Sequence, residues 1–82
     1  MLARDLAREA IRVNTVQPGL FDTPAMRRAP PEFLAAMGRR APFPNRLGRP
    51  EEFAHLVLAL IRNPYANGAV VRLDGALRME PR

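Results

Sequence analysis

The residues best placed to do chemistry form one short turn, Pro18-Gly19, which directly follows a stretch rich in β-branched residues. Glycine lets the backbone approach a ligand closely, and proline fixes the direction in which the chain leaves the strand. Open α/β sheets bind their ligands at the carboxyl ends of their strands, so the turn lies where a cofactor would sit. The alternative is a plain strand-ending turn, in which Thr23 is an ordinary loop residue before Pro24.

Two other side chains invite a catalytic interpretation, the single histidine and the single tyrosine of the chain. His55 lies one position before an apolar helical face and has no visible acid or base partner, which favours a surface or partly packed side chain. Tyr65 lies in the loop from Asn63 to Gly68, where packing under the loop is expected. The chain has no cysteine, so no disulfide or thiolate site is available and no metal site is expected.

The composition is that of one soluble domain, with 82 residues of which 48% are hydrophobic and 26% charged. No apolar run approaches the roughly 18 residues that span a membrane. The net charge of +5 raises the question of nucleic-acid binding, but the thirteen arginines are scattered from Arg4 to Arg82. We therefore expect a solvated arginine surface, with neither nucleic acid nor membrane as a partner. The start of the chain lacks a signal-peptide pattern, so the cytoplasm is the expected location.

A helix and a strand are expected to position the turn. Leu2, Leu6 and Ala10 recur at helical spacing between charged residues, which predicts an amphipathic helix over residues 1–10. No capping residue precedes this helix, as expected for an element that starts in its own middle. The stretch Ile11 to Val16 then predicts a strand, which the proline-glycine pair ends.

A long segment over residues 20–49 carries five prolines around a possible short helix from Glu32 to Met37. Loops of this length in compact domains are usually functional or mobile. This segment is therefore predicted to be a lid.

A helix and a second strand complete the pattern. Pro50 followed by two glutamates predicts a helix start, and Asn63-Pro64 predicts its end. Ala69 to Leu73 predicts a second strand, parallel to the first in a βαβ unit. Two strands alone are marginally stable, so the unit indicates a larger sheet. The helix carries an apolar stripe that is expected to be core: Phe53, Leu56, Val57, Leu60 and Ile61.

Three segments resemble the last third of the short-chain dehydrogenases/reductases: IRVNTVQPGLFDTP (Ile11 to Pro24), RLGRPEEFAHLV (Arg46 to Val57) and NGAVVRLDGALRM (Asn67 to Met79). The resemblance covers almost the whole chain. It implies an α/β fold, the C-terminal portion of a Rossmann-type doubly wound parallel sheet, in the order helix, strand, lid, helix, strand. Residues 1–82 would be the C-terminal segment of a single NAD(P)-binding domain, with residues 20–49 as a substrate-binding lid.

The resemblance also implies roles for individual residues. In the family the backbone of the turn meets the nicotinamide carboxamide, and the threonine that follows bonds to the cofactor. By position, the cofactor-binding residues are Pro18, Gly19, Leu20, Phe21 and Thr23. The expected cofactor is NAD, with NADP left open. The apolar lid residues suit an acyl-CoA or a steroid-like substrate: Met26, Phe33, Leu34, Met37 and Phe43.

Within the family, the PGLFDTP turn, the PFPNRLG stretch and the ending from Asn63 onwards are similar to the branch that oxidises 3-hydroxyacyl-CoA and hydroxysteroid alcohols to ketones with NAD. Asp22 departs from the small residue expected at its position. Family members that act on sugars or on 3-ketoacyl carrier substrates therefore stay as an alternative.

The proton-transfer residues of the family are not found in this chain. The family uses a serine, a tyrosine four positions before a lysine, and a glycine-rich turn, whereas this chain has no serine and no lysine. No catalytic residue is therefore expected, and the isolated chain should be inactive. An inactive fragment or an interaction piece is the alternative to a part of an enzyme. Family members usually form tetramers, so the resemblance implies a homo-oligomer through the helix at 50–62 and the strand at 69–74.

Overall fold

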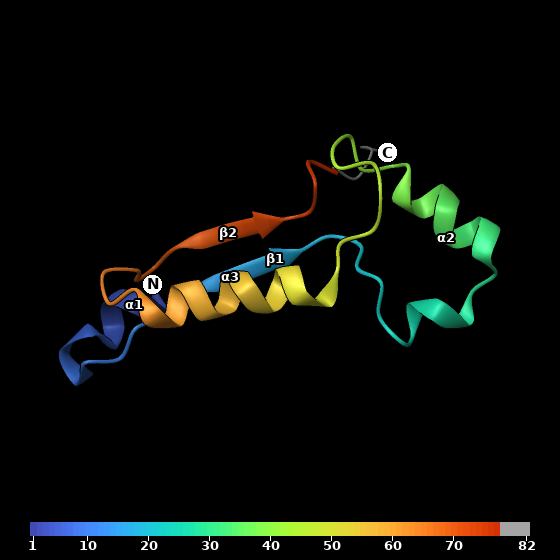
Figure 1. Cartoon of the computed structure of the whole chain (residues 1–82). Coiled ribbons are helices and arrows are strands. Elements are labelled where there is room, and N and C mark those ends of the chain that lie inside the picture. The colour runs from blue at the N-terminus through green and yellow to red at the C-terminus, as the bar shows by residue number, and fades with distance from the viewer. Residues whose placement is uncertain (78–82) are drawn as a thin grey trace.

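Two parallel strands form the sheet, β1 (Thr15–Pro18) and β2 (Val70–Leu73), with their first residues paired and their last residues paired. The computed structural model describes residues 1–77. The crossover between the strands contains helix α3 (Pro50–Arg62), which runs along the sheet in Figure 1. The predicted α/β class and the parallel βαβ unit are confirmed.

Helix α3 begins and ends where its sequence predicts. Pro50 stands in the first turn, and the Glu52 carboxylate accepts a hydrogen bond from the Arg49 N–H at 2.7 Å. This bond satisfies a backbone donor near the helix start that has no partner within the helix. At the other end Asn63 leaves the helical conformation, with φ −96° and ψ 102°.

The apolar stripe of α3 is only partly covered. Leu56, Val57 and Leu60 are half-buried, whereas Phe53 is 36% and Ile61 is 60% exposed. Within residues 1–77, the only buried apolar side chains are Ala3 and Ala41, neither of which belongs to α3. The prediction that the whole stripe forms a core is therefore wrong for this chain, because two strands and one long helix cannot enclose apolar side chains on all sides.

Strand β1 starts at Thr15, four residues later than predicted. Residues 11–14 are held by the loop before β2 instead of by a partner strand. The Val13 N–H donates to Asn67 Oδ1 at 3.0 Å, and the Gly68 N–H donates to the Val13 carbonyl at 2.8 Å. A β-branched sequence forms a ladder only where a partner strand lies opposite, and β2 does so only from Thr15 onwards.

Arg12 ties this segment to the carboxyl end of α3. Its guanidinium donates to the carbonyls of Leu60 at 3.0 Å, Ile61 at 2.7 Å, Asn63 at 3.1 Å and Ala66 at 3.0 Å. The last carbonyls of a helix have no partner within it, and a cation suits its negative end. Arg12 thus joins the first part of the chain to the second, at the end of the sheet opposite the lid.

The predicted amino-terminal helix is broken in its middle. Its residues form a short helix α1 (Leu2–Asp5) and a 3-10 helix η1 (Ala7–Glu9), after which Ala10 takes the left-handed conformation with φ 60°. Only Ala3 of this segment is buried. A continuous helix of this length needs packing along its apolar side, which these contacts do not supply.

The predicted lid, residues 20–49, leaves the sheet at the carboxyl ends of both strands and projects away from it (Figure 1). It contains a 3-10 helix η2 (Met26–Arg28) and helix α2 (Pro31–Gly38), which includes the short helix that the sequence predicts. Within residues 1–77, no helix is long and apolar enough to cross a membrane.

Candidate functional site

The two ends of the lid meet at the carboxyl end of β1. The Gly48 N–H donates to the Leu20 carbonyl at 2.9 Å, and the Asp22 N–H donates to the Gly48 carbonyl at 2.8 Å. Together these bonds form a parallel bridge between Phe21 and Gly48. The lid is therefore a loop closed at its base, and the predicted cofactor turn is one side of that base.

Close packing requires two glycines at this base. A Cβ on Gly19 would lie 2.6 Å from the Cβ of Asp74, and a Cβ on Gly48 would lie 2.6 Å from the ring of Phe21. The Gly19 N–H also donates to the Leu73 carbonyl at 2.9 Å. The sequence suggests that Gly19 allows a ligand to approach; the structure adds that it lets β1 leave the sheet against the end of β2.

An open hollow of about 430 Å³ lies beside the turn. The rings of Phe21 and Phe53 meet edge to face, with centroids 5.9 Å apart and an interplanar angle of 81°. The structure brings all five predicted cofactor-binding residues to this hollow, although their role in binding stays a prediction. The residues that line it are Pro18, Gly19, Leu20, Phe21, Thr23, Met26, Pro50 and Phe53.

The turn has polar groups that can hold a ligand. Within residues 1–77, no hydrogen-bond acceptor is found for the backbone N–H of Leu20 or Phe21. The Thr23 hydroxyl oxygen accepts a hydrogen bond from the Met26 N–H at 3.2 Å. Since a hydroxyl both accepts and donates, its own proton is available to a ligand. These groups suit a carbonyl or carboxamide oxygen.

Asp22, the residue that departs from the family pattern, is paired inside the lid. The Arg27 guanidinium donates to its two carboxylate oxygens, at 3.0 Å and 3.4 Å. The hydrogen bond to Asp22 and the charge of Asp22 raise the pKa of Arg27. Both side chains are exposed, so the pair adds little to stability. Its effect is local, since it closes the turn that contains Thr23.

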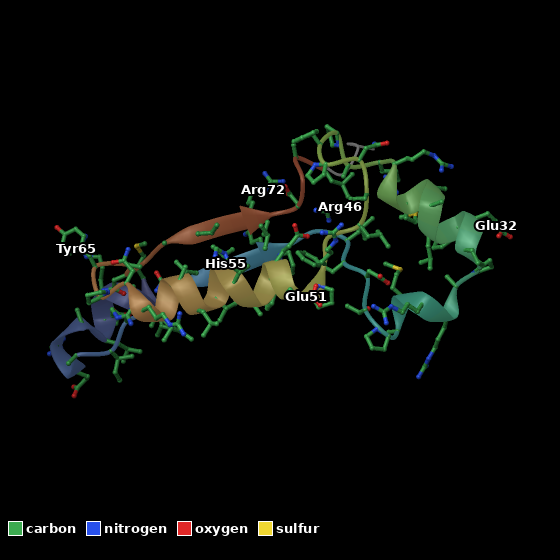
Figure 2. All side chains as sticks on the ribbon, viewed as in Figure 1. Glu32, Arg46, Glu51, His55, Tyr65 and Arg72 are labelled. Atoms are coloured by element: carbon green, nitrogen blue, oxygen red, sulfur yellow. The ribbon has the colours of Figure 1, made fainter. Side chains whose placement is uncertain are left out.

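Arg46 and Glu52 hold the other side of the base. The Arg46 guanidinium donates to both carboxylate oxygens of Glu52 and to the Leu47 carbonyl, each at 2.9 Å. The hydrogen bond from Arg46, with that from the Arg49 N–H, lowers the pKa of Glu52 to about 2. Figure 2 shows Arg46 near the junction of the lid and α3. The sequence alone does not predict this pair. Arg46 precedes α3 and Glu52 lies in its first turn, and a separation of six residues matches none of the side-chain spacings that bring residues together within a helix.

The predicted lid residues do not gather at one site. Met26 lines the hollow, and Met37 lines a smaller cavity of about 100 Å³ between the lid and the end of β2. Phe33 is 48% and Phe43 82% exposed, while Leu34 is half-buried. Of these five residues only Met26 adjoins the hollow, and the substrate role of the others stays a prediction.

Neither Tyr65 nor His55 lines the hollow, and Figure 2 shows Tyr65 at the end of the molecule opposite residues 20–49. Tyr65 is 97% exposed, so the prediction that it packs under its loop is wrong. The loop closes through Asn63 instead, because the Asn63 Oδ1 accepts a hydrogen bond from the Tyr65 N–H at 3.1 Å and the Asn63 carbonyl accepts one from the Ala66 N–H at 3.1 Å. His55 is exposed on α3. Within the described part of the chain, no group of three or more His, Cys, Asp or Glu side chains is placed to hold a metal ion.

The sequence matches known proteins over almost its whole length. A family described as enoyl-(acyl carrier protein) reductase matches residues 1–77. The 3-hydroxyacyl-CoA dehydrogenase type-2 of Homo sapiens is 54% identical over 80 residues, which are 98% of this chain and 31% of that protein. The ipsdienol dehydrogenase of Ips pini is 43% identical over 77 residues, or 94% of this chain and 30% of that protein.

A solved structure matches equally well. The crystal structure of 3-hydroxyacyl-CoA dehydrogenase type-2 from Mycobacterium avium has a TM-score of 0.90 and 49% sequence identity, over 99% of this chain and 31% of that one. The chain thus spans about a third of the length of the relatives that it matches.

Proposed function

The chain belongs to the short-chain dehydrogenase/reductase family, and we propose that it forms part of an NAD-dependent oxidoreductase that converts a 3-hydroxyacyl-CoA, or a hydroxysteroid alcohol, to the ketone. In this proposal the turn at residues 18–23 holds the nicotinamide side of the cofactor and the lid covers the substrate. The observation that carries the proposal is the hollow at the end of β1, which all five predicted cofactor-binding residues line.

The residues around the hollow suit a nicotinamide ring. A flat ring with one carboxamide needs apolar walls and a few well-placed polar groups. Phe21, Phe53 and Met26 offer the walls. The N–H groups of Leu20 and Phe21 and the Thr23 hydroxyl are available to the carboxamide. Bound NAD would supply the hydride acceptor, while this part of the chain orients the ring and keeps water away from it.

The charge of the lid favours an acyl-CoA over a steroid. Residues 20–49 contain six arginines and two carboxylates, whereas the other residues between 1 and 77 contain five of each. The net positive charge of the described residues is therefore concentrated in the lid. A CoA thioester carries phosphate groups that such a field attracts and that arginine binds well, and a steroid alcohol carries no charge.

The proposal assigns proton transfer to residues that this sequence does not contain. The chain has no serine and no lysine, and Tyr65 lies at the end of the molecule opposite the lid (Figure 2). We therefore expect the 82-residue chain to be inactive by itself. The missing groups would come from the natural polypeptide in which this sequence occurs, or from a homologous enzyme on which the chain docks.

The proposal includes a homo-oligomer that forms through α3 and β2. Leu58 and Ile61 of α3 and Val70 of β2 are 44%, 60% and 63% exposed. Exposed apolar side chains on both of these elements support the proposal, because folded proteins rarely leave large apolar surfaces uncovered.

The test is a fluorescence titration of NADH into the natural polypeptide, with Thr23→Val and Thr15→Val as a matched pair. Both changes replace a hydroxyl by a methyl group, but only Thr23 lines the hollow. The loss of one hydrogen bond, about 1 kcal/mol, should weaken NADH binding about fivefold in Thr23→Val alone. Thr23→Ser, which keeps the hydroxyl, should bind as the wild type does.

Equal NADH affinity of the two valine variants would contradict the cofactor role of Thr23, and no binding by the wild type would contradict the proposed function. Turnover of 3-hydroxybutyryl-CoA and of a hydroxysteroid, each with NAD and with NADP, then distinguishes the substrates and the cofactors.

A further inference from the structure

The Arg46–Glu52 ion pair lies where the lid, α3 and the predicted cofactor turn join. The Arg46 guanidinium donates hydrogen bonds to Glu52, in the first turn of α3, and to the carbonyl of Leu47. Leu47 is the residue before Gly48. Gly48 in turn makes two backbone hydrogen bonds, at 2.8 and 2.9 Å, to the residues on either side of Phe21. Arg46 is therefore two residues, and Glu52 four residues, along the chain from Gly48, which forms the bridge at the base of the lid.

The bridge leaves the Phe21 ring little freedom. On one side the ring lies against Gly48, where an added Cβ would be only 2.6 Å away. On the other side it meets the ring of Phe53, the residue next to Glu52 on α3. One turn of α3 thus carries both the ion pair and the ring contact. Because Phe21 lines the hollow, a shift of residues 46–48 changes its shape.

We propose that Arg46 and Glu52 are positioning residues for the cofactor turn. The pair fixes Gly48, Gly48 fixes Phe21, and Phe21 shapes the hollow that receives the nicotinamide ring. Neither Arg46 nor Glu52 is among the residues that line this hollow, so both act through Gly48. The inference rests on the proposed function.

Helix capping alone does not account for Arg46. Glu52 already caps α3 through the Arg49 N–H at 2.7 Å, and Arg46 adds bonds that reach back into the lid. The preceding residue, Glu51, carries the same charge in the same helical turn. Within residues 1–77, the Glu51 carboxylate makes no hydrogen bond or ion pair. Glu51→Gln is therefore a matched control for Glu52→Gln.

The test compares NADH binding and steady-state kinetics of the natural polypeptide for Glu52→Gln, Glu51→Gln and Arg46→Lys. Glu52→Gln should raise the Kd for NADH and the KM for NAD about tenfold, the scale of one lost hydrogen bond between charged groups. Glu51→Gln should leave both unchanged. Arg46→Lys keeps the charge but not the two-pronged contact, so it should give an intermediate value.

The kcat at saturating NAD separates positioning from a loss of folded protein. A displaced turn raises KM with little change in kcat, whereas a smaller folded fraction lowers the apparent kcat and leaves KM unchanged. The inference is overturned if Glu52→Gln and Glu51→Gln have the same KM, or if only kcat falls. If the wild type fails to bind NADH, both the proposed function and this inference are contradicted. That result is distinct from equal KM values or a fall in kcat alone, which concern the variants and leave NADH binding by the wild type intact.

Discussion

Arg12 joins the segment before β1 to the carboxyl end of α3, and a substitution of Arg12 tests how much this contact stabilises the fold. Its guanidinium makes four hydrogen bonds of 2.7 to 3.1 Å to carbonyls at the end of α3 and in the loop that follows. Arg12→Met keeps most of the apolar stem and removes every donor. Arg62→Met removes a cation from the last turn of the same helix, but Arg62 makes no side-chain hydrogen bond within residues 1–77.

The expected effect follows from the exposure of this contact. The carbonyls reach water, so each lost bond is partly replaced, and each contributes about 0.5 kcal/mol, the lower end of the usual range. The four bonds of Arg12 then contribute about 2 kcal/mol. The loss of a cation near the helix end costs roughly 0.3–1 kcal/mol in both variants and cancels in their difference.

The assay is urea unfolding of the natural polypeptide, with the free energy of unfolding extrapolated to water. Arg12→Met should be about 2 kcal/mol less stable than Arg62→Met. A difference below about 0.5 kcal/mol, the contribution of a single bond on this scale, would show that these four bonds do not hold the two parts of the chain together.

The base of the lid and its charge give three further predictions. Gly48→Ala should lower the free energy of unfolding by roughly 1–3 kcal/mol, because the added Cβ would lie 2.6 Å from the Phe21 ring. If urea unfolding shows the same loss of free energy in a Phe21→Ala background, this close contact is excluded. Since Arg46 lowers the pKa of Glu52 from its ordinary 4.5 to about 2, the Glu52 carboxylate stabilises the fold above about pH 4.5 and loses that effect as the pH falls toward 2. Over that range the urea midpoint of the wild type should fall more steeply than that of Glu52→Gln, and parallel curves would exclude the ion pair. The KM for a 3-hydroxyacyl-CoA should rise as the ionic strength increases from about 0.05 to about 0.3 M, because salt screens the arginines of the lid; an equal rise for a neutral hydroxysteroid would contradict this.

The elements that the sequence predicts well are those with local signals. Pro50 and the two glutamates after it fix the start of α3 through backbone geometry and the helix dipole, which need no distant partner. The end at Asn63-Pro64 is equally local. The valine-rich strand β2 is also found where expected.

The predictions that fail depend on contacts far apart in the sequence. Strand β1 begins later than predicted because its first residue is set by where β2 lies opposite. The sequence from Ile11 to Val16 does not contain that information. Tyr65 is exposed because its loop closes through a hydrogen bond from the Tyr65 N–H to the Asn63 side chain, without the tyrosine ring. The apolar stripe of α3 has the right period, but its burial depends on what covers it.

The site is predicted in part. The Pro18-Gly19 turn and its resemblance to a known family lead to the residues that line the hollow. The resemblance does not lead to Arg46 and Glu52, whose pairing arises only when the lid returns to the start of α3. The apolar lid residues share a chemistry but not a location, since a long loop does not fix the direction of its side chains by period.

Hydrogen exchange of the natural polypeptide, with and without saturating NADH, tests the cofactor role of residues 18–23 most directly. The N–H groups of Leu20 and Phe21 have no acceptor within residues 1–77. Their exchange should slow about tenfold or more when NADH binds, while the loop around Tyr65, at the other end of the molecule, should exchange as before. Unchanged exchange at Leu20 and Phe21, at NADH concentrations that saturate the fluorescence titration, would contradict the assignment of this turn to the cofactor.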